Sequence, residues 1–415
     1  MFRKRSLALC RHLKYFLFVA VSQISLTGAV ESGCIEKSYS SATDIVCVCN
    51  STYCDTIPPL GQLGANQTAI YVSSKSGKRF EKTVVSFGSH SAPSLFNLKD
   101  VEVVVDPSES FQTILGFGGA FTDSVGINLN RLSSAARQNL LQSYFGQSGL
   151  GYTVGRVPMA SCDFSTHAYS YCDTSGDFNL TTFNLTVEDF VLKVPYIKQA
   201  RNLAGVLDLF ASPWSAPGWM KSSGEMVGGG TLKGDFNGEY YRTWANYFVR
   251  FFEEYHKEGI DFWGVTLQNE PSAGAIPNYS WQAMYFSAAM QRDFAAYLLG
   301  PTLKNSTVTS GLKLMVVDDQ RYTLPLQPDI IFASDVASNY IDGVAVHWYW
   351  DYLFPASLLG ATHDHHPDKF ILATEACNGY LAPNTGPIMG DWGRGELYGK
   401  DIIEDLQNWA IGWVD

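Results

Sequence analysis

The sequence lacks an excess of positive charge and, after its first residues, lacks any long apolar run. Lysine and arginine total 29 against 40 aspartates and glutamates, so the formal net charge is -11 over 415 residues. With no basic stripe, this balance argues against a nucleic-acid partner, and it suits an acidic lumen, where protonation reduces self-repulsion. No later stretch reaches the roughly 18 apolar residues of a membrane-spanning helix. We therefore expect no transmembrane span.

The N-terminus is the one place with an apolar run of note. MFRKRSLALCRHLK is basic, YFLFVAVSQISL is apolar, and TGAVES supplies small residues for cleavage near Ala29. This order predicts a secretory signal peptide at 1–32. A membrane anchor is the alternative, but the apolar run is too short to span a bilayer. We expect the mature protein in the lumen of the secretory pathway.

Cysteines are few, and half of the eight lie close together. Such density is typical of a small disulfide-stapled element in an oxidising compartment, whereas a zinc knuckle would need a histidine nearby. Four cysteines allow three pairings. The clustered residues are Cys34, Cys47, Cys49 and Cys54. The later ones are Cys162, Cys172 and Cys377, an odd number, so a Cys162–Cys172 bridge stays open.

Six N-glycosylation sequons fit the same compartment. Sequons also arise by chance, and those that carry glycans must lie on exposed surface. The acceptor residues are Asn50, Asn66, Asn179, Asn184, Asn278 and Asn305.

The pattern of apolar runs divides the rest of the chain into two regions. Residues 33–110 carry short β-type runs (AIYVSS, TVVSFG, VEVVV) between Gly, Ser and Pro, which predicts a disulfide-stapled β region, part of an accessory sandwich. Residues 111–415 alternate strands and helices, as an α/β fold of the (β/α)8 TIM-barrel type requires. The predicted strands are 113–120, 151–159, 206–212, 261–270, 312–319, 342–349, 369–376 and 410–415. The predicted helices are 131–145, 240–259, 280–300 and 398–410.

Two of these strands end in a glutamate. DFWGVTLQNE ends at Glu270, on the fourth strand, and KFILATE ends at Glu375, on the seventh. Strands four and seven face each other across the mouth of a barrel. Retaining hydrolysis of a glycosidic bond needs two carboxyls about 5 to 5.5 Å apart. Alone, a glutamate at a strand end is usually an ordinary surface group.

The residue types within the motifs are more specific than the spacing between the two glutamates. GFGGAFTDS, RVPMASCDFS, ASPWSAPGWMK, NEPSAG, DDQR, VHWYWD and ATEACNG occur in this order. Together they resemble the glucosylceramidase (lysosomal acid β-glucosidase) family of retaining glycoside hydrolases, from about Cys34 to the last residue. The resemblance implies a lysosomal enzyme that cleaves glucosylceramide at a membrane surface. It also implies a saposin-type activator protein, anionic phospholipid, no metal or cofactor, and disulfides Cys34–Cys47 and Cys49–Cys54.

The resemblance also implies roles for residues at the strand ends. Glu270 would be the general acid and base, and Glu375 the nucleophile, kept ionised by donors such as Arg156. Asn269 matches the residue that bonds the sugar 2-hydroxyl, and Tyr349 matches a donor to Glu375.

A further set of residues would bind the sugar or support the residues that act on it. Asp163 would accept hydrogen bonds from the sugar hydroxyls farthest from the scissile bond, and Trp214 would offer an apolar face. Alone, either residue is more often a cap or a core residue. His347 would orient its neighbours from a buried position. Indirect support is assigned to Asp123, Asp318, Asp319 and Arg321.

Two motifs partly match the patterns of other kinds of site, a phosphate loop and a metal site. GGGTLKG at 228–234 lacks the full GxxxxGK[ST] spacing of a phosphate loop, so it is interpreted as a flexible lid. THDHHPD at 362–368 could hold a metal, but histidines on a polar loop are more often solvated.

The chain ends at Asp415, inside the predicted eighth strand, whereas in the family it continues. We therefore expect the barrel to be incomplete, with an open seam between strands seven and one. The alternative to an active hydrolase is a truncated, inactive product that only binds.

Overall fold

The computed structural model describes residues 34–39, 45–88, 104–380, 383 and 385–415. They form two compact units, a small one around β1–β4 and a large one that contains a barrel. The predicted signal peptide, and residues 101–103 of the third predicted β run, lie outside the described residues.

The small unit contains two antiparallel pairs of strands. β1 (Glu36–Lys37) pairs with β2 (Val46–Cys47), and β3 (Gln67–Val72) pairs with β4 (Glu81–Ser86). The longer pair corresponds to the first two predicted runs. The Cys34–Cys47 disulfide ties the start of this unit to β2, and Cys49–Cys54 closes a short loop that belongs to the large unit.

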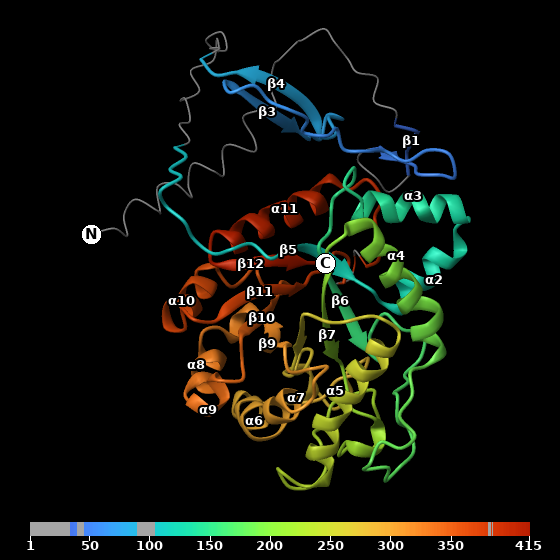
Figure 1. Cartoon of the computed structure of the whole chain (residues 1–415), viewed down its shortest axis with the longest axis vertical. Coiled ribbons are helices and arrows are strands. Elements are labelled where there is room, and N and C mark those ends of the chain that lie inside the picture. Colours follow the sequence, from blue (N-terminus) through green and yellow to red (C-terminus); the bar gives the residue numbers. More distant parts are fainter. Residues whose placement is uncertain (1–33, 40–44, 89–103, 381–382, 384) are drawn as a thin grey trace. The chain divides into compact units, whose positions relative to one another are not determined.

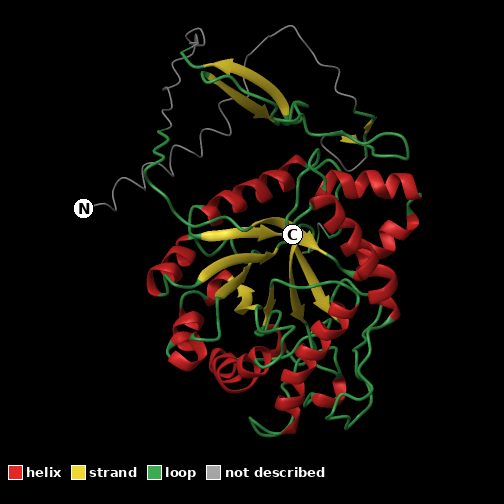
Figure 2. Ribbon diagram, in the orientation of Figure 1, coloured by secondary structure: helices red, strands yellow, loops and turns green. Residues whose placement is uncertain are grey.

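The large unit is a closed barrel of eight parallel strands in chain order (Figures 1 and 2). The predicted fold class is confirmed, and each predicted strand overlaps an observed one. The strands are β5 (Gly116–Ala120), β6 (Val154–Met159), β7 (Asp208–Pro213), β8 (Gly264–Thr266), β9 (Lys313–Gln320), β10 (Gly343–His347), β11 (Phe370–Glu375) and β12 (Ala410–Val414).

The prediction of an open seam is wrong. β12 pairs in parallel with β11 on one side and β5 on the other, with residues 412–414 opposite residues 116–118. The backbone N–H of Asp415 adds a hydrogen bond to the carbonyl of Gly118 at 3.1 Å. The strands β12 and β5 can approach because residue 412 is a glycine: a Cβ there would lie 2.4 Å from the carbonyl oxygen of Gly116.

Helices lie around the strands in Figure 2. The longest described helix is α5 (Glu239–Lys257), which is amphipathic, because residues at every third or fourth position from Tyr241 to Tyr255 are buried. The predicted helix at 131–145 is divided at Ser133, which caps the second part, and the one at 280–300 begins only at Ala288, after the cap Ser287. The helices are α2 (Asp123–Arg131), α3 (Ser134–Phe145), α4 (Val194–Ala204), α5 (Glu239–Lys257), α6 (Ala288–Phe294), α7 (Gly300–Lys304), α8 (Leu326–Phe332), α9 (Asp335–Ser338), α10 (Ser357–His365) and α11 (Trp392–Leu406).

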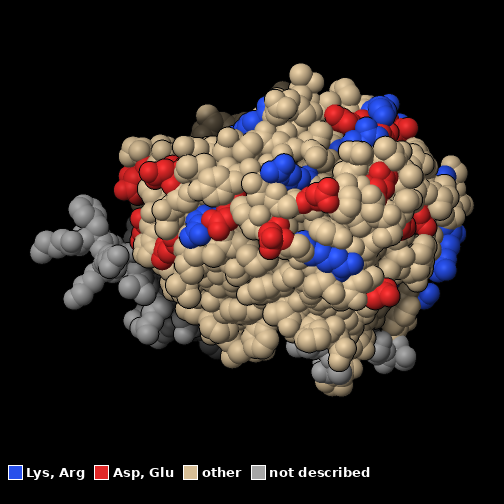
Figure 3. Space-filling model, turned by 90° about the horizontal axis from the view of Figure 1, so that it is seen from below, with Lys and Arg blue, Asp and Glu red and all other residues tan. Residues whose placement is uncertain are grey.

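The barrel interior is a packed core rather than a pore. Its apolar side chains are Val154, Phe210, Met315, Ala345, Leu372 and Val414, each from a different strand. Among the described residues, no helix combines the length and apolar character needed to cross a membrane. On the face shown in Figure 3, acidic and basic side chains are interspersed among neutral ones. That face therefore presents no continuous basic surface of the kind that binds nucleic acid.

Candidate active site

Two glutamates lie together at the carboxyl ends of barrel strands. Glu375 is the last residue of β11, the seventh barrel strand, and Glu270 follows β8, the fourth. A carboxylate oxygen of Glu270 and one of Glu375 lie within 4.8 Å of each other. The backbone of Glu270 has a φ of 39°, a strained conformation for a residue with a side chain. Such strain is typical of functional sites.

Glu375 is surrounded by donors. Arg156 Nη1 donates to its Oε2, and the Tyr349 hydroxyl donates to Oε1 at 2.8 Å. Burial alone would raise the pKa of Glu375, but the charges of His347 and Arg156 and the hydrogen bond from Tyr349 hold it below its usual value. The Glu375 carboxylate is therefore ionised near neutral pH.

Glu270 accepts hydrogen bonds from two neutral side chains, lies near another carboxyl and has no arginine partner among the described residues. Gln320 Nε2 donates to Oε1 at 2.7 Å, and the Tyr279 hydroxyl donates to Oε2 at 3.2 Å. Asp319 is buried nearby, where burial and the charge of Glu270 raise its pKa to about 6. The two glutamates thus have different surroundings, since Arg156 contacts only Glu375.

His347 lies between the two glutamates. Its Nδ1 is 3.2 Å from Glu270 Oε1 and 3.8 Å from Glu375 Oε1, and its Nε2 is 3.0 Å from Asp318 Oδ1. Burial opposes a charged imidazole, but Glu375 and Asp318 raise the pKa of His347 to about 10. The ring is therefore protonated and supplies a positive charge to the site.

Asp318 contacts both Arg156 and His347 and so holds the two cations of this cluster together. Its Oδ2 accepts from Arg156 Nη2 at 2.9 Å and from Thr266 at 2.7 Å, and its Oδ1 accepts from Thr374 at 2.7 Å. Although burial opposes ionisation, Arg156 and His347 hold the pKa of Asp318 well below its usual value. Every charge in this buried cluster has a partner of opposite sign, which buried charges require.

Arg156 also orients two residues predicted to bind substrate. Its Nη2 donates to Asn269 Oδ1 at 2.8 Å, which leaves the Asn269 amide nitrogen to donate elsewhere. Its guanidinium lies over the Trp214 ring, 4.8 Å from the centroid. Trp214 directly follows β7, so neighbouring strand ends supply these side chains.

A cavity of about 730 Å³ opens beside Glu375. Asp163, Trp214 and Tyr349 line the cavity together with Glu375, and we call this part its polar end. Polar and apolar side chains of α2 and α3 also line the cavity. The Asp163 side chain is open to the cavity. The protein around it and the charges of Glu375 and Glu270 raise the pKa of Asp163 to about 7.

The remaining predicted supporting residues lie farther from the glutamates. Asp123 accepts from Ser165 Oγ at 2.5 Å and contacts Lys193 at 3.5 Å, next to the loop of Asp163. Arg321 instead contacts the buried carboxylates Asp351, Asp401 and Asp405. Arg321 can therefore support the site only indirectly, through the elements that carry Asp351, Asp401 and Asp405.

The motifs at 362–368 and 228–234, which partly match a metal site and a phosphate loop, make other contacts. His365 Nδ1 and His366 Nε2 each lie 2.9 Å from Asp329 Oδ1, so these groups satisfy one another on a partly exposed surface. The loop at 228–234 is tied down by the buried Lys221, which donates to the carbonyl of Gly228 at 2.9 Å. That the protein needs no metal stays a prediction.

The structure describes the surroundings of the possible Cys162–Cys172 bridge and of the six predicted glycosylation sites. Cys162 and Cys172 are both free and buried, so the structure contains no bridge between them. Asn50 is half-buried, and its side-chain oxygen accepts from the backbone of Thr52 at 2.8 Å. The exposed acceptors are Asn66, Asn179, Asn184, Asn278 and Asn305.

Sequence reasoning missed several members of the site. Gln320 follows Asp319 at the end of β9, and its place in the DDQR motif could have revealed it. Tyr279 lies in an irregular loop and carries no comparable signal. Thr266 and Thr374 sit inside strands, where a threonine is unremarkable until the fold brings both to Asp318.

Comparison with known proteins identifies the family. Residues 114–415 match the model of the glycosyl hydrolase family 30 TIM-barrel domain. The chain belongs to glycosyl hydrolase family 30. This family 30 chain is 51% identical over 382 residues to "Putative glucosylceramidase 4" of Caenorhabditis elegans, which covers 92% of this chain and 72% of that protein. It is 40% identical over 407 residues to "Lysosomal acid glucosylceramidase" of Mus musculus, which covers 98% and 77%.

The solved structures agree with this assignment. SrfJ from Salmonella typhimurium matches the family 30 chain with a TM-score of 0.73 at 28% identity, over 84% of this chain and 74% of that one. The predicted family is confirmed, and the protein is a glycoside hydrolase.

Proposed function

We propose that this hydrolase cleaves a β-glucosidic bond with retention of anomeric configuration. The observation that carries the proposal is the closeness of the two glutamates, since one carboxylate oxygen of each lies within 4.8 Å of the other. Retaining enzymes hold their carboxyls about 5 to 5.5 Å apart, whereas inverting enzymes need about 6.5 to 9.5 Å to admit a water molecule.

The surroundings of the two glutamates support a division of roles. Glu375 is ionised beside Arg156, so it attacks the anomeric carbon and forms a glycosyl ester. Glu270 gives its proton to the departing glycosidic oxygen. It then takes a proton from the water that attacks the ester. The sugar leaves with its original configuration, and Glu375 returns to the carboxylate form.

The polar end of the cavity would hold the sugar. The free amide nitrogen of Asn269 donates to the 2-hydroxyl, a contact that strengthens in the transition state. Asp163 accepts hydrogen bonds from the hydroxyls farthest from the scissile bond. Trp214 covers an apolar face of the ring.

We further propose glucosylceramide as the substrate and the lysosome as the site of action. The named relatives support this choice. A saposin-type activator and anionic phospholipid at a membrane surface belong to the same proposal.

Azide rescue tests the roles with an aryl β-glucoside that has a good leaving group. Glu375→Gly should lose about 10⁴-fold or more of kcat, and azide should restore turnover with α-glucosyl azide as product. Glu270→Gly should accumulate the glycosyl enzyme, and azide should then give β-glucosyl azide. The opposite pattern of products would reverse the two roles.

A proton NMR time course of the unmutated protein tests retention directly. The β anomer of glucose should appear first, before mutarotation. First release of the α anomer would exclude the proposed mechanism, and an absence of turnover would favour the binding-only alternative.

A further inference from the structure

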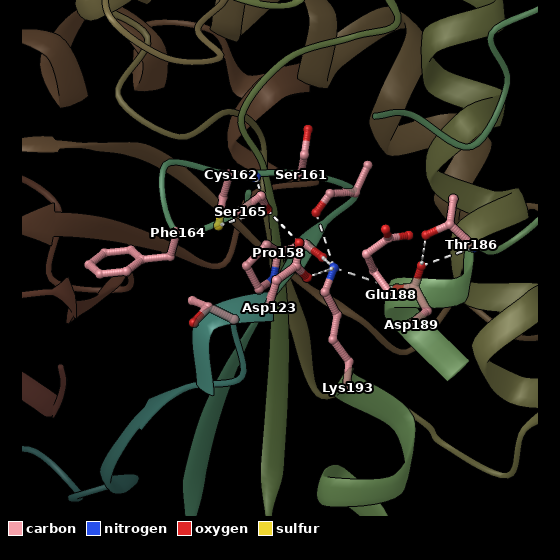
Figure 4. Close-up of polar contacts among 12 residues, drawn as sticks. Asp123, Pro158, Ser161, Cys162, Phe164, Ser165, Thr186, Glu188, Asp189 and Lys193 are labelled. Carbon is pink, nitrogen blue, oxygen red and sulfur yellow. Dashed lines mark hydrogen bonds and ion pairs between the residues drawn. The ribbon is translucent and has the colours of Figure 1, made fainter. Parts of the chain in front are cut away.

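A buried lysine that the proposed reaction does not use contacts the segment that leads to Asp163. Lys193 is the last residue of a π-helical turn, Asp189–Lys193, that leads into α4, and its side chain is fully buried. Its Nζ donates to the carbonyls of Pro158 and Ala160 at 3.3 and 3.1 Å (Figure 4).

Two carboxylates balance the charge of this ammonium. Asp123 and Asp189 each place an oxygen 3.5 Å from Lys193 Nζ. Asp189 also accepts from the hydroxyls of Tyr171 and Tyr255 at 2.7 and 2.6 Å. A buried cation with this many partners holds its neighbours at fixed distances, because moving any of them would leave a charge unpaired.

These contacts enclose the segment that carries Asp163. On one side, the Lys193 ammonium holds the carbonyl of Ala160, whose backbone has a strained φ of 67°. On the other side, Ser165 Oγ donates to Asp123 at 2.5 Å and accepts from the backbone N–H of Cys162 at 3.0 Å. Figure 4 shows the Lys193 and Ser165 side chains both directed at Asp123.

We infer that Lys193 is a positioning residue: through Ala160 and the Asp123–Ser165 link, it sets where the Asp163 carboxylate stands in the cavity. It thereby controls discrimination for the distal hydroxyls of the sugar. The inference rests on the proposed role of Asp163 as their acceptor. Lys193 touches no substrate, so its removal should change selectivity more than it changes the chemistry at the anomeric carbon.

The test is a ratio of kcat/KM values. Aryl β-glucoside is compared with its 4-deoxy and 6-deoxy analogues, which lack the hydroxyls assigned to Asp163. Asp163→Asn should lower the preference for the parent glucoside by about two- to tenfold, the range for one ordinary hydrogen bond. Lys193→Met should lower it in the same direction. In the double variant the two losses should not add, because both remove one contact.

Arg321→Met is the matched control, since it also removes a buried cation with carboxylate partners, but outside the Asp163 loop. It should lower the melting temperature and keep the ratio. Ser165→Ala cuts the link to Asp123 without burying a charge, so it serves if Lys193→Met fails to fold.

The outcomes separate the two claims. If Asp163→Asn leaves the ratio unchanged, the proposed role of Asp163 fails and the inference fails with it. If Asp163→Asn lowers the ratio while the folded Lys193→Met, or Ser165→Ala in its place, keeps it, the positioning role alone is overturned.

Discussion

Among its described residues the large unit buries two arginines, and their partners are arranged differently. Arg156 donates from Nε to Ser212 at 3.1 Å, from Nη1 to Glu375, and from Nη2 to Asp318 at 2.9 Å. His347 adds a second positive charge to the same cluster. Two cations therefore face the carboxylates, and the pKa of Glu375 and that of Asp318 are both lowered.

Arg321 faces three carboxylates alone. Its Nη2 contacts Asp405 at 2.5 Å and Asp401 at 3.4 Å on α11, as well as Asp351 after β10. Arg321 Nε and Asp351 Oδ1 have no hydrogen-bond partner among the described residues. Burial, only partly offset by Arg321, raises the pKa of Asp351 to about 10. The balanced cluster thus lowers the pKa of its carboxyls, as a nucleophile requires, whereas the unbalanced one raises the pKa of Asp351 and of Asp405 and serves structure.

The largest effect should follow from removing Arg156. Arg156→Met leaves Glu375 and Asp318 buried without their main cation, so we expect about 3 to 5 kcal/mol of lost stability. We also expect a loss of about 100- to 1,000-fold in kcat. Urea unfolding and kcat on an aryl glucoside measure the two. Arg321→Met should lose stability and keep its kcat; an equal loss of kcat in both variants would remove the distinction between the clusters.

The next effect compares two aspartates by stability alone. Asp318→Asn removes an ionised partner of Arg156 and His347, so at pH 5 it should cost about 3 kcal/mol or more. Asp351→Asn replaces an already protonated carboxyl with a neutral amide of similar shape and should cost less than about 1 kcal/mol. Chemical denaturation at one pH measures both. A larger cost for Asp351→Asn would show that Asp351 is ionised in the folded protein.

The sequence predicts the barrel well because each strand carries its own apolar run, and the order of the runs determines the topology. The sequence also predicts that Glu270 and Glu375 meet at one mouth, since Glu375 ends a strand and Glu270 follows one. It does not predict which cation meets which acid. Arg321 follows Asp319 by two residues, yet it contacts α11, some 80 residues later. The closure by β12 was likewise missed, because it depends on the close approach of glycine-containing strands rather than on the length of one run.

The carboxyls of Asp351 and Glu375 should respond to pH with opposite sign. The folded pKa of Asp351 is raised, so its contribution to stability is complete below pH 4 and is lost as the pH rises towards 10. The folded pKa of Glu375 is lowered, so its contribution is present above pH 4.5 and is lost in acid.

Between pH 5 and pH 8 Asp351 should contribute a slope of at most about 1.4 kcal/mol per pH unit, and His347, whose pKa is also raised, adds a slope of the same sign above about pH 6.5. Unfolding free energies measured across this range should fall for the parent and fall less steeply for Asp351→Asn. Parallel curves for the two proteins would count against a protonated Asp351.

The smallest effect should come from a single hydroxyl at the edge of the Arg156 cluster. Tyr349 donates to Glu375 Oε1 at 2.8 Å, and this bond helps to hold the pKa of Glu375 down. In Tyr349→Phe the acid limb of the kcat/KM profile should move up by about one pH unit, the equivalent of one modest charged hydrogen bond. Tyr279→Phe, which removes a donor to Glu270, should leave that limb in place, because the limb reports ionisation of the nucleophile. If the limb stays fixed in Tyr349→Phe as well, Arg156 and His347 alone keep Glu375 ionised.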